Sequence, residues 1–554
     1  MLSPVLVKEV KVSLRKTRAA ILLIVFLGAG FLATWMLWPQ EGIYTLSAQS
    51  SHNLFTVLAM GQLALVALFA PAFTAPALTV EKERNTLEGL YATRLTSADI
   101  VLGKIGGSLT FLLLVILAGV PVTSTCLLLG GVSTADVVWM YAIIFLTALH
   151  YGLLGLMLSS LCNKTQRAVM LTYVLIIVLS VATVVPAVLL LSRAGPSWGG
   201  VLRLLSSASP FAVMASVIEP ALLHGGLGTT ARTEVWAFSF WSLGVSAAVV
   251  GALAVRLSTP PVPRPRVDEE SGHASFLNRF KRFPFRLIDP SKRRRMIGPL
   301  SNPVFVKELR TMIFGRLHYL VRAVYMCVAV SLALALGAAL SYEFVTTQAI
   351  AILAVSLQSV LFLFVGPVLS ATLISSEIEG ERFDLLRLTR LSGWRIVSGK
   401  FQAALLPLAI LLVATLPPYF LLAKIDPMLD MQMVIIRTGL TMLCMLLFIV
   451  SAGMFFSAVG RRSSFSIAAT YVVVVIICVL GLIGLFRLDS FSHPVLYAMF
   501  VINPIVTVLS EVALPAVRGR FDLWQSNLVF LLVGSGILLL LTVLRVSMLL
   551  RPEE

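Results

Sequence analysis

A nearly uncharged stretch close to the start of the chain constrains the fold more than any other feature. Between Arg18 and Glu81 the only Asp, Glu, Lys or Arg residue is Glu41. A helix needs about 20 mostly apolar residues to cross roughly 30 Å of hydrocarbon at about 1.5 Å per residue. This stretch is long enough for two membrane spans and a short loop, so it predicts a helical hairpin in a bilayer.

The same pattern continues along all 554 residues, of which 58% are hydrophobic and 12% are charged. Such a composition is too apolar for a water-soluble globular protein. We predict an all-α integral membrane protein with about twelve transmembrane helices. The expected spans cover residues 20–38, 54–79, 105–130, 137–161, 168–192 and 235–255, followed by 323–342, 347–374, 401–423, 433–459, 464–486 and 524–549.

The distribution of lysine and arginine predicts the orientation. With the N-terminus in the cytoplasm, 35 of the 43 Lys and Arg residues fall on the inner side, as the positive-inside rule requires. We therefore expect a multi-pass protein of the plasma (cytoplasmic) membrane with both termini in the cytoplasm. Topogenic bias and attraction to anionic lipid account for the net charge of +17, so a nucleic-acid partner is not expected.

Short motifs recur in the same order in the two halves of the chain. Pro4 to Glu9 returns as Pro303 to Glu308, at an offset of 299 residues. An offset of 296 relates Thr93-Arg94-Leu95 to Thr389-Arg390-Leu391, Gly103-Lys104 to Gly399-Lys400, Gln62 to Gln358 and Pro71 to Pro367, and an offset of 298 relates Thr172-Tyr173-Val174 to Thr470-Tyr471-Val472. This order predicts an internal duplication.

The duplication divides the chain into a first six-helix unit (1–258), a Pro-rich basic cytoplasmic linker (259–300) and a second six-helix unit (301–554). A unit with six spans has both ends on one side of the membrane. Its direct copy therefore stands parallel to it, and a path between two parallel repeats is a natural place for a substrate.

In each half, the second expected span is followed by a segment that combines acidic and basic residues with a pair of apolar side chains. Leu87 and Leu90 are three residues apart, as are Phe383 and Leu386, so each pair can share a helical face that enters a partner's groove. An ordinary solvated loop is the alternative. The candidate contact residues are Glu81, Glu83, Arg84, Thr86, Leu87, Glu88 and Leu90, with Glu377, Glu379, Glu381, Arg382, Phe383, Asp384 and Leu386.

Two further sets of residues have both a functional and a purely structural interpretation. Lys8, Lys11 and Arg15 share one helical face before the first span, and Lys307 and Arg310 begin the same pattern. They indicate interfacial helices, or simply topogenic charge. The second set lies within spans: Gln62, Pro71, Gln358 and Pro367 could line a substrate path, although interhelical packing and hydrogen bonding are the stronger interpretation.

These motifs resemble the ABC type-2 transporter permeases. The residues that carry the resemblance are Pro4 to Glu9, Glu81 to Leu90, Thr93 to Leu95, Ile100 to Lys104 and Ser209-Pro210-Phe211. The resemblance implies an interfacial elbow helix before the first span and a coupling helix, after the second span, seated on an ATPase. It also implies an exporter that moves an unknown substrate between its halves, with two separate ATPase subunits as partners beside the lipid bilayer.

The sequence lacks the GxxxxGK[ST] loop that would cradle nucleotide phosphates, and it lacks an HExxH pattern. We therefore expect no enzyme activity, no cofactor and no metal in this chain; ATP and Mg²⁺ would be bound by the partner ATPase. One departure from the family pattern is that Glu381-Arg382 is shifted by two residues relative to Glu83-Arg84.

An ion-coupled secondary transporter is the main alternative, since parallel six-plus-six duplication also suits that class. Such transporters keep ionisable groups deep in the membrane. His150 is the one candidate near a span centre, and a packed, hydrogen-bonded imidazole is its plainer interpretation. We expect Arg437, near a span end, to snorkel. A membrane scaffold that transports nothing is a third class.

Overall fold

The computed structural model describes residues 23–24, 27–28, 30–32, 34–35, 48–84, 86–92, 96–130, 132–184, 186–187, 196–218, 231–258, 302–311, 324–325, 327–328, 331–332, 347–389, 391–420, 431–460, 462–487, 493–514, 517 and 521–550. The predicted linker and the elbow residues Lys8, Lys11 and Arg15 lie outside these ranges. Below, the first half means the described residues up to 258, and the second half means those from 302 onward.

The described residues form helices and no strand, as the sequence predicts. The first half contains α3 (Ala48–Thr74), α4 (Pro76–Glu83), α5 (Leu87–Tyr91), α6 (Ser97–Leu129), α7 (Thr134–Leu161), α8 (Thr165–Ile177), the π-helical turn η2 (Val178–Ala182), α10 (Pro196–Ser206), α11 (Pro210–Ile218) and α12 (Ala231–Ser258). The second half contains α14 (Pro303–Thr311), α16 (Thr347–Ala371), α17 (Ser375–Glu379), α18 (Phe383–Arg387), α19 (Gly393–Ala414), α21 (Met431–Val459), α22 (Ser463–Ile483), the 3₁₀ turn η4 (Gly484–Arg487), α23 (His493–Ile502), α24 (Pro504–Val512) and α26 (Trp524–Leu550).

Eight helices in the described part are long and apolar enough to cross a membrane, and the number rises to 10 if each of two bent helix pairs counts as one span. The protein is therefore an all-α membrane protein. Two of the twelve predicted spans, at 20–38 and 323–342, fall mostly outside the described residues. The predicted spans at 168–192 and 464–486 correspond to shorter apolar helices, Thr165–Ser180 and Ser463–Cys478.

Local sequence explains where several helices begin. Thr96 and Asp99 form a reciprocal capping box at the start of α6, and Ser133 and Asp136 form another at the start of α7. The side chain and the backbone of each pair satisfy amide groups that have no partner within the helix. In the second half, Ser392 caps α19 by accepting a hydrogen bond from the Arg395 amide.

Two sharp bends were not predicted from the sequence. Helices α10 and α11 meet at 103°, and α23 and α24 meet at 102°. The second helix of each pair begins with a proline, Pro210 or Pro504, which favours the first turn of a helix. The Asn503 side chain caps α24 by accepting hydrogen bonds from the Ile505 and Val506 amides. The bends thus occur at Ser209-Pro210 and Asn503-Pro504, two similar motifs separated by 294 residues in the sequence.

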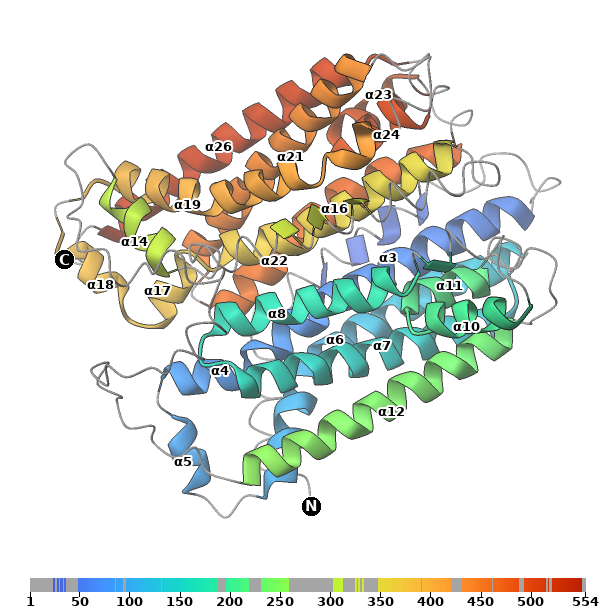
Figure 1. The fold of residues 1–554 in the computed structure, drawn as a ribbon, viewed down its shortest axis with the longest axis horizontal. Coiled ribbons are helices and arrows are strands. Elements are labelled where there is room, and N and C mark those ends of the chain that lie inside the picture. Colours follow the sequence, from blue (N-terminus) through green and yellow to red (C-terminus); the bar gives the residue numbers. More distant parts are fainter. Residues whose placement is uncertain are drawn as a thin grey trace, which may run out of the picture.

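The short helices gather at the two ends of the bundle. Helices α4, α5, α14, α17 and α18 lie at one end, here called the polar end, and the bent pairs α10/α11 and α23/α24 lie at the other (Figure 1). Helices α12 and α26 run along opposite outer edges (Figure 1), and only 22% of the most apolar window of each is buried, as expected for helices that face lipid.

The halves meet along four helices. Helix α8 of the first half packs against α16 of the second, and α3 packs against α22; α16 and α22 also contact each other. We call this boundary the seam. One continuous cluster of buried apolar side chains extends through both halves, so the seam is part of the hydrophobic core.

Candidate coupling site

The end of the second span is anchored in the same way in both halves. The Ser159 hydroxyl of α7 accepts hydrogen bonds from the amides of Leu78 and Thr79, at 3.0 and 3.1 Å. The Ser457 hydroxyl of α21 does the same for the two amides that open α17, at 2.9 and 2.8 Å. A helix break leaves such amides without intrahelical acceptors, and each serine satisfies a pair of them. The polar loop therefore starts from a fixed point in each half.

The acidic loop residues Glu83 and Glu379 are tied to the helices at the seam. A Glu83 carboxylate oxygen accepts a hydrogen bond from the Thr165 amide at the start of α8, at 2.9 Å. A Glu379 oxygen accepts one from the Ser463 amide at the start of α22, at 3.0 Å. Neither helix has a side-chain cap of its own, so each carboxylate supplies the missing acceptor and complements the positive end of the helix dipole.

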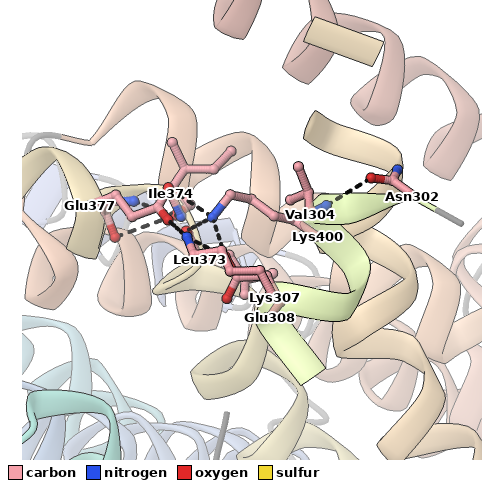
Figure 2. A network of polar contacts seen from close by, with 10 residues as sticks. Asn302, Val304, Lys307, Glu308, Leu373, Ile374, Glu377 and Lys400 are labelled. Atoms are coloured by element: carbon pink, nitrogen blue, oxygen red, sulfur yellow. Dashed lines mark hydrogen bonds and ion pairs between the residues drawn. The ribbon is translucent and has the colours of Figure 1, made fainter. Parts of the chain in front are cut away.

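A buried lysine forms a second tie in each half. Lys104 of α6 forms an ion pair with Glu81, and Lys400 of α19 forms one with Glu377 at 2.8 Å. The Lys400 side chain is fully buried, with 0% exposure, and its ammonium also contacts Glu308 of α14 and the Leu373 carbonyl, each at 2.8 Å (Figure 2). An ammonium has three donors, and three oxygen-bearing groups surround it here. Helices α14, α17 and α19 are joined at this one group.

The outer part of this network is partly open to solvent. Lys307 of α14 pairs with Glu377, and with its neighbour Glu308 at 3.3 Å. Burial acts to raise the pKa of Glu308, but the charges of Lys400 and Lys307 outweigh it and hold the pKa below its usual value. Burial acts to lower the pKa of Lys307, and the two carboxylates outweigh it and raise the pKa. Both groups therefore stay charged near neutral pH.

Helix α14 packs closely against α19, which explains why Gly399 and Asn302 stand where they do. Asn302 donates a hydrogen bond to the Arg395 carbonyl at 2.7 Å and accepts one from the Val304 amide at 3.0 Å. A Cβ atom on Gly399 would lie 2.9 Å from the Phe305 amide nitrogen. Only glycine permits this approach. Of the predicted elbow residues, Lys307 thus takes part in the network, whereas the Arg310 side chain lies outside the described part.

Two of the apolar side chains predicted to contact a partner do not face outward. Leu87 and Phe383 are buried, with exposures of 7% and 5%, and pack within the protein's own core. The expectation that these two side chains enter a partner's groove is wrong, because each five-residue helix turns that face toward the bundle. Leu385 and Leu388 are instead exposed, at 66% and 84%. Leu386 is half-buried, and the side chains of Glu88 and Leu90 lie outside the described part.

Apart from Glu377 and Glu379, the charged residues of the second loop lie at its surface. Glu381 lies in the left-handed region with φ of 55°, Arg382 is exposed, and Asp384 pairs with Arg387 at 3.0 Å. By its bond to α22, Glu379 rather than Glu381 is the counterpart of Glu83. In the first loop, exposed Thr86 lies 3.4 Å from the Glu81 carbonyl.

The two loops also meet across the seam. The Arg84 guanidinium donates a hydrogen bond to the Glu379 carbonyl at 3.3 Å and lies 3.9 Å from its carboxylate. The acidic cap of one half therefore contacts the basic loop residue of the other.

Comparison with known families identifies the first half of this arrangement. Residues 41–256 match the family described as ABC-2 family transporter protein. The chain carries an ABC-2 family permease unit. Residues 41–256 therefore correspond to the membrane component of an ABC transporter rather than to its ATPase. The search of curated proteins found no match to the chain.

The in-span residues of the permease form ties between its helices. The Tyr141 hydroxyl donates to Gln62 at 3.4 Å, and the Tyr419 hydroxyl donates to Gln358 at 2.6 Å. The amide group of Gln62 donates to the Ile116 carbonyl at 3.2 Å, while that of Gln358 donates to Thr415 at 2.9 Å. Both glutamines are buried, as the interhelical interpretation requires. Pro71 and Pro367 lie inside α3 and α16.

Two other ionisable groups in the permease have local partners. His150 is buried, with Nδ1 3.4 Å from the Ser246 hydroxyl, as the packed-imidazole interpretation expects. Arg437 does not snorkel: its Nη1 donates to both carboxylate oxygens of Glu511 of α24, at 3.0 and 3.1 Å. The described part of the permease contains no cluster of metal-ligating residues.

Sequence reasoning missed several residues that organise the permease. Lys104 and Lys400 served only as markers of the duplication, although a repeated Gly-Lys beside an acidic loop could have indicated an ion pair. Glu308 likewise belonged to a repeated motif. The repeated motifs thus marked these residues in the sequence, but they did not indicate which helices lie close together.

Proposed function

We propose that this permease moves its substrate between its halves when two separate ATPase subunits, bound at the polar end, hydrolyse ATP. ATP and Mg²⁺ would reside in those subunits. In this proposal the polar end and both termini lie in the cytoplasm, the membrane is the plasma (cytoplasmic) membrane, and transport is outward.

One observation carries the proposal: each polar loop is bonded to the first turn of a seam helix. A displacement of the loop around Glu83 acts directly on α8, and a displacement around Glu379 acts directly on α22. Helices α8 and α22 line the boundary along which the halves would separate. The buried lysine ties make each loop move with α6 or α19 instead of flexing alone.

The exposed surface of α18 supports a protein partner at this end. Leu385 and Leu388 project outward beside Arg382, Asp384 and Arg387. Apolar anchors ringed by charges of both signs are typical of protein interfaces, where the charges set orientation.

The first test is co-purification of the full-length chain with an ABC ATPase from its own genome, followed by ATP-driven transport in liposomes. We expect Glu83→Ala with Glu379→Ala to lower transport and ATP turnover by about tenfold, because the loops lose their grip on the seam helices. The matched control is Asp136→Ala, which removes a carboxylate cap from α7 at the opposite end. An equal loss in the control would assign the effect to general destabilisation.

The second test concerns binding. Leu385→Ser with Leu388→Ser changes exposed side chains only, so folding should be retained while binding of the ATPase weakens by about tenfold. Transport driven by a proton or sodium gradient without ATP would overturn the proposal in favour of a secondary transporter.

A further inference from the structure

Two equivalent tyrosines meet at the seam. Tyr173 of α8 and Tyr471 of α22 have ring centroids 5.2 Å apart, and both side chains are fully buried. Tyr173 also packs edge-on against Phe364 of α16, with centroids 5.5 Å apart. The chain therefore places an aromatic cluster where the two halves touch.

Each tyrosine hydroxyl is held by a carbonyl of its own half. Tyr173 donates to the Leu68 carbonyl in α3, and Tyr471 donates to the Phe364 carbonyl in α16 at 2.7 Å. Both acceptors lie three residues before a proline inside the helix, Pro71 or Pro367. A proline removes one amide donor and bends the preceding turn, which frees carbonyl oxygens for other donors. The duplicated Pro and Tyr residues thus form two copies of one hydrogen-bonded unit.

This cluster lies well inside the bundle. Tyr173 is eight residues beyond the start of α8, about 12 Å along the helix from the loop that Glu83 holds. Packed aromatic rings whose hydroxyls are already satisfied offer no group to water, and a dry apolar constriction blocks polar solutes and ions.

We propose that Tyr173 and Tyr471 form the gate of the path between the halves, closed in this structure by contact between the two rings, with each hydroxyl–carbonyl bond orienting its ring within its own half. The inference rests on the proposed function, because it assumes that the halves separate along this seam. Glu83 and Glu379 hold the ends of the same two helices that carry the tyrosines. Movement of the polar loops would therefore act on the gate through α8 and α22.

Mere packing is the competing explanation, and the chain offers a matched control for it. Tyr151 and Tyr419 are equally buried, and their hydroxyls also form hydrogen bonds, to Ser180 and Gln358. Each of those two bonds lies within a single half. Loss of either control ring would disturb the core without opening the seam.

The deciding experiment measures passive leak of potassium from liposomes that contain the full-length chain, without ATPase or nucleotide. We expect Tyr173→Ala with Tyr471→Ala to raise the leak by about tenfold or more, because the dry constriction is lost. Tyr173→Phe with Tyr471→Phe keeps the rings and should stay nearly tight. Tyr151→Ala with Tyr419→Ala should remain at the wild-type level.

Two results would overturn the gate: an alanine pair as tight as wild type, or a control pair that leaks equally. Because the assay contains no ATPase, a failed ATPase partnership would leave its outcome unchanged. Should the alanine pair fail to fold, a second measurement applies. Tyr173→Cys and Tyr471→Cys are introduced into a chain that lacks its five native cysteines, and a protease site is placed in the 259–300 linker. After cleavage of the linker, a short thiol cross-linker should join the two halves into one product. Absence of this product would contradict the proposal.

Discussion

The two halves agree closely where elements are tied inside the bundle and differ where they meet its surroundings. The serine anchors, the acidic caps on the seam helices, the buried lysine pairs and the tyrosine–carbonyl bonds all occur twice. At the polar end, Leu385 and Leu388 correspond to Gly89 and Ala92 at the 296-residue offset. The two halves thus share their internal connections and differ at their exposed faces.

The opposite end shows the same divergence. Arg437 corresponds to Trp139 at the 298-residue offset. In the second half Arg437 pairs with Glu511 and lies 5.2 Å from the Trp524 ring centroid. In the first half Trp139 instead packs edge-on against Trp236, with centroids 5.8 Å apart. In the second half an ion pair therefore holds α24 of the bent pair against α21. At the corresponding position of the first half, α7 instead makes an aromatic contact with α12.

The largest effect is expected at the internal ties. Lys400→Met removes the fully buried cation shared by Glu308 and Glu377 and leaves them only the half-exposed Lys307, which should lower the free energy of unfolding by about 3–5 kcal/mol. Thermal unfolding of the purified chain measures the change. Adding Glu308→Gln and Glu377→Gln removes the uncompensated charges and should recover much of the loss. If Lys400→Met is as stable as wild type, the buried lysine ion pairs found in both halves do not contribute to stability as expected.

A smaller effect is expected at the divergent end. Arg437→Leu removes the ion pair with Glu511 and should cost about 1.5–3 kcal/mol. A double variant, Arg437→Trp with Glu511→Val, introduces the residues found at the corresponding positions of the first half, Trp139 and Val217. It should cost less stability, because a well-packed apolar pair can replace an ion pair with little change in the free energy of unfolding. Thermal unfolding again provides the measurement. A double variant that is less stable than Arg437→Leu would show that the two ends are not interchangeable solutions.

The smallest effect is a pH dependence of the second-half network. The pKa of Glu308 is lowered in the folded state, so its contribution is fully present above the ordinary value of 4.5 and is lost as the pH falls through the lowered value. The pKa of Lys307 is raised above 10.5, so its contribution is present below 10.5 and is lost as the pH rises through the raised value. Stability measured against pH should show both limits, and Glu308→Gln should remove the acidic one. An unchanged acidic limit in that variant would contradict the assignment.

The sequence was sufficient for the helical class, the membrane environment and the pairing of equivalent positions, because apolar run length and repeated motifs carry that information directly. It misplaced Leu87 and Phe383, since a three-residue spacing identifies a helical face without saying which way that face points. It also missed the bends at Ser209-Pro210 and Asn503-Pro504, where a proline is compatible with either a loop or the start of a new helix. Contacts between distant elements, such as Lys400 with Glu308, depend on packing that no local pattern encodes.

The contact between Tyr173 and Phe364 has a consequence for how a transporter of this kind can change over time. The position equivalent to Phe364 in the first half is Leu68, so the two sides of the central cluster already differ. In an assembly of two identical chains, any substitution at such a place would alter both sides together. Within one polypeptide each side can mutate alone, so the path proposed between the halves is free to have an asymmetric lining.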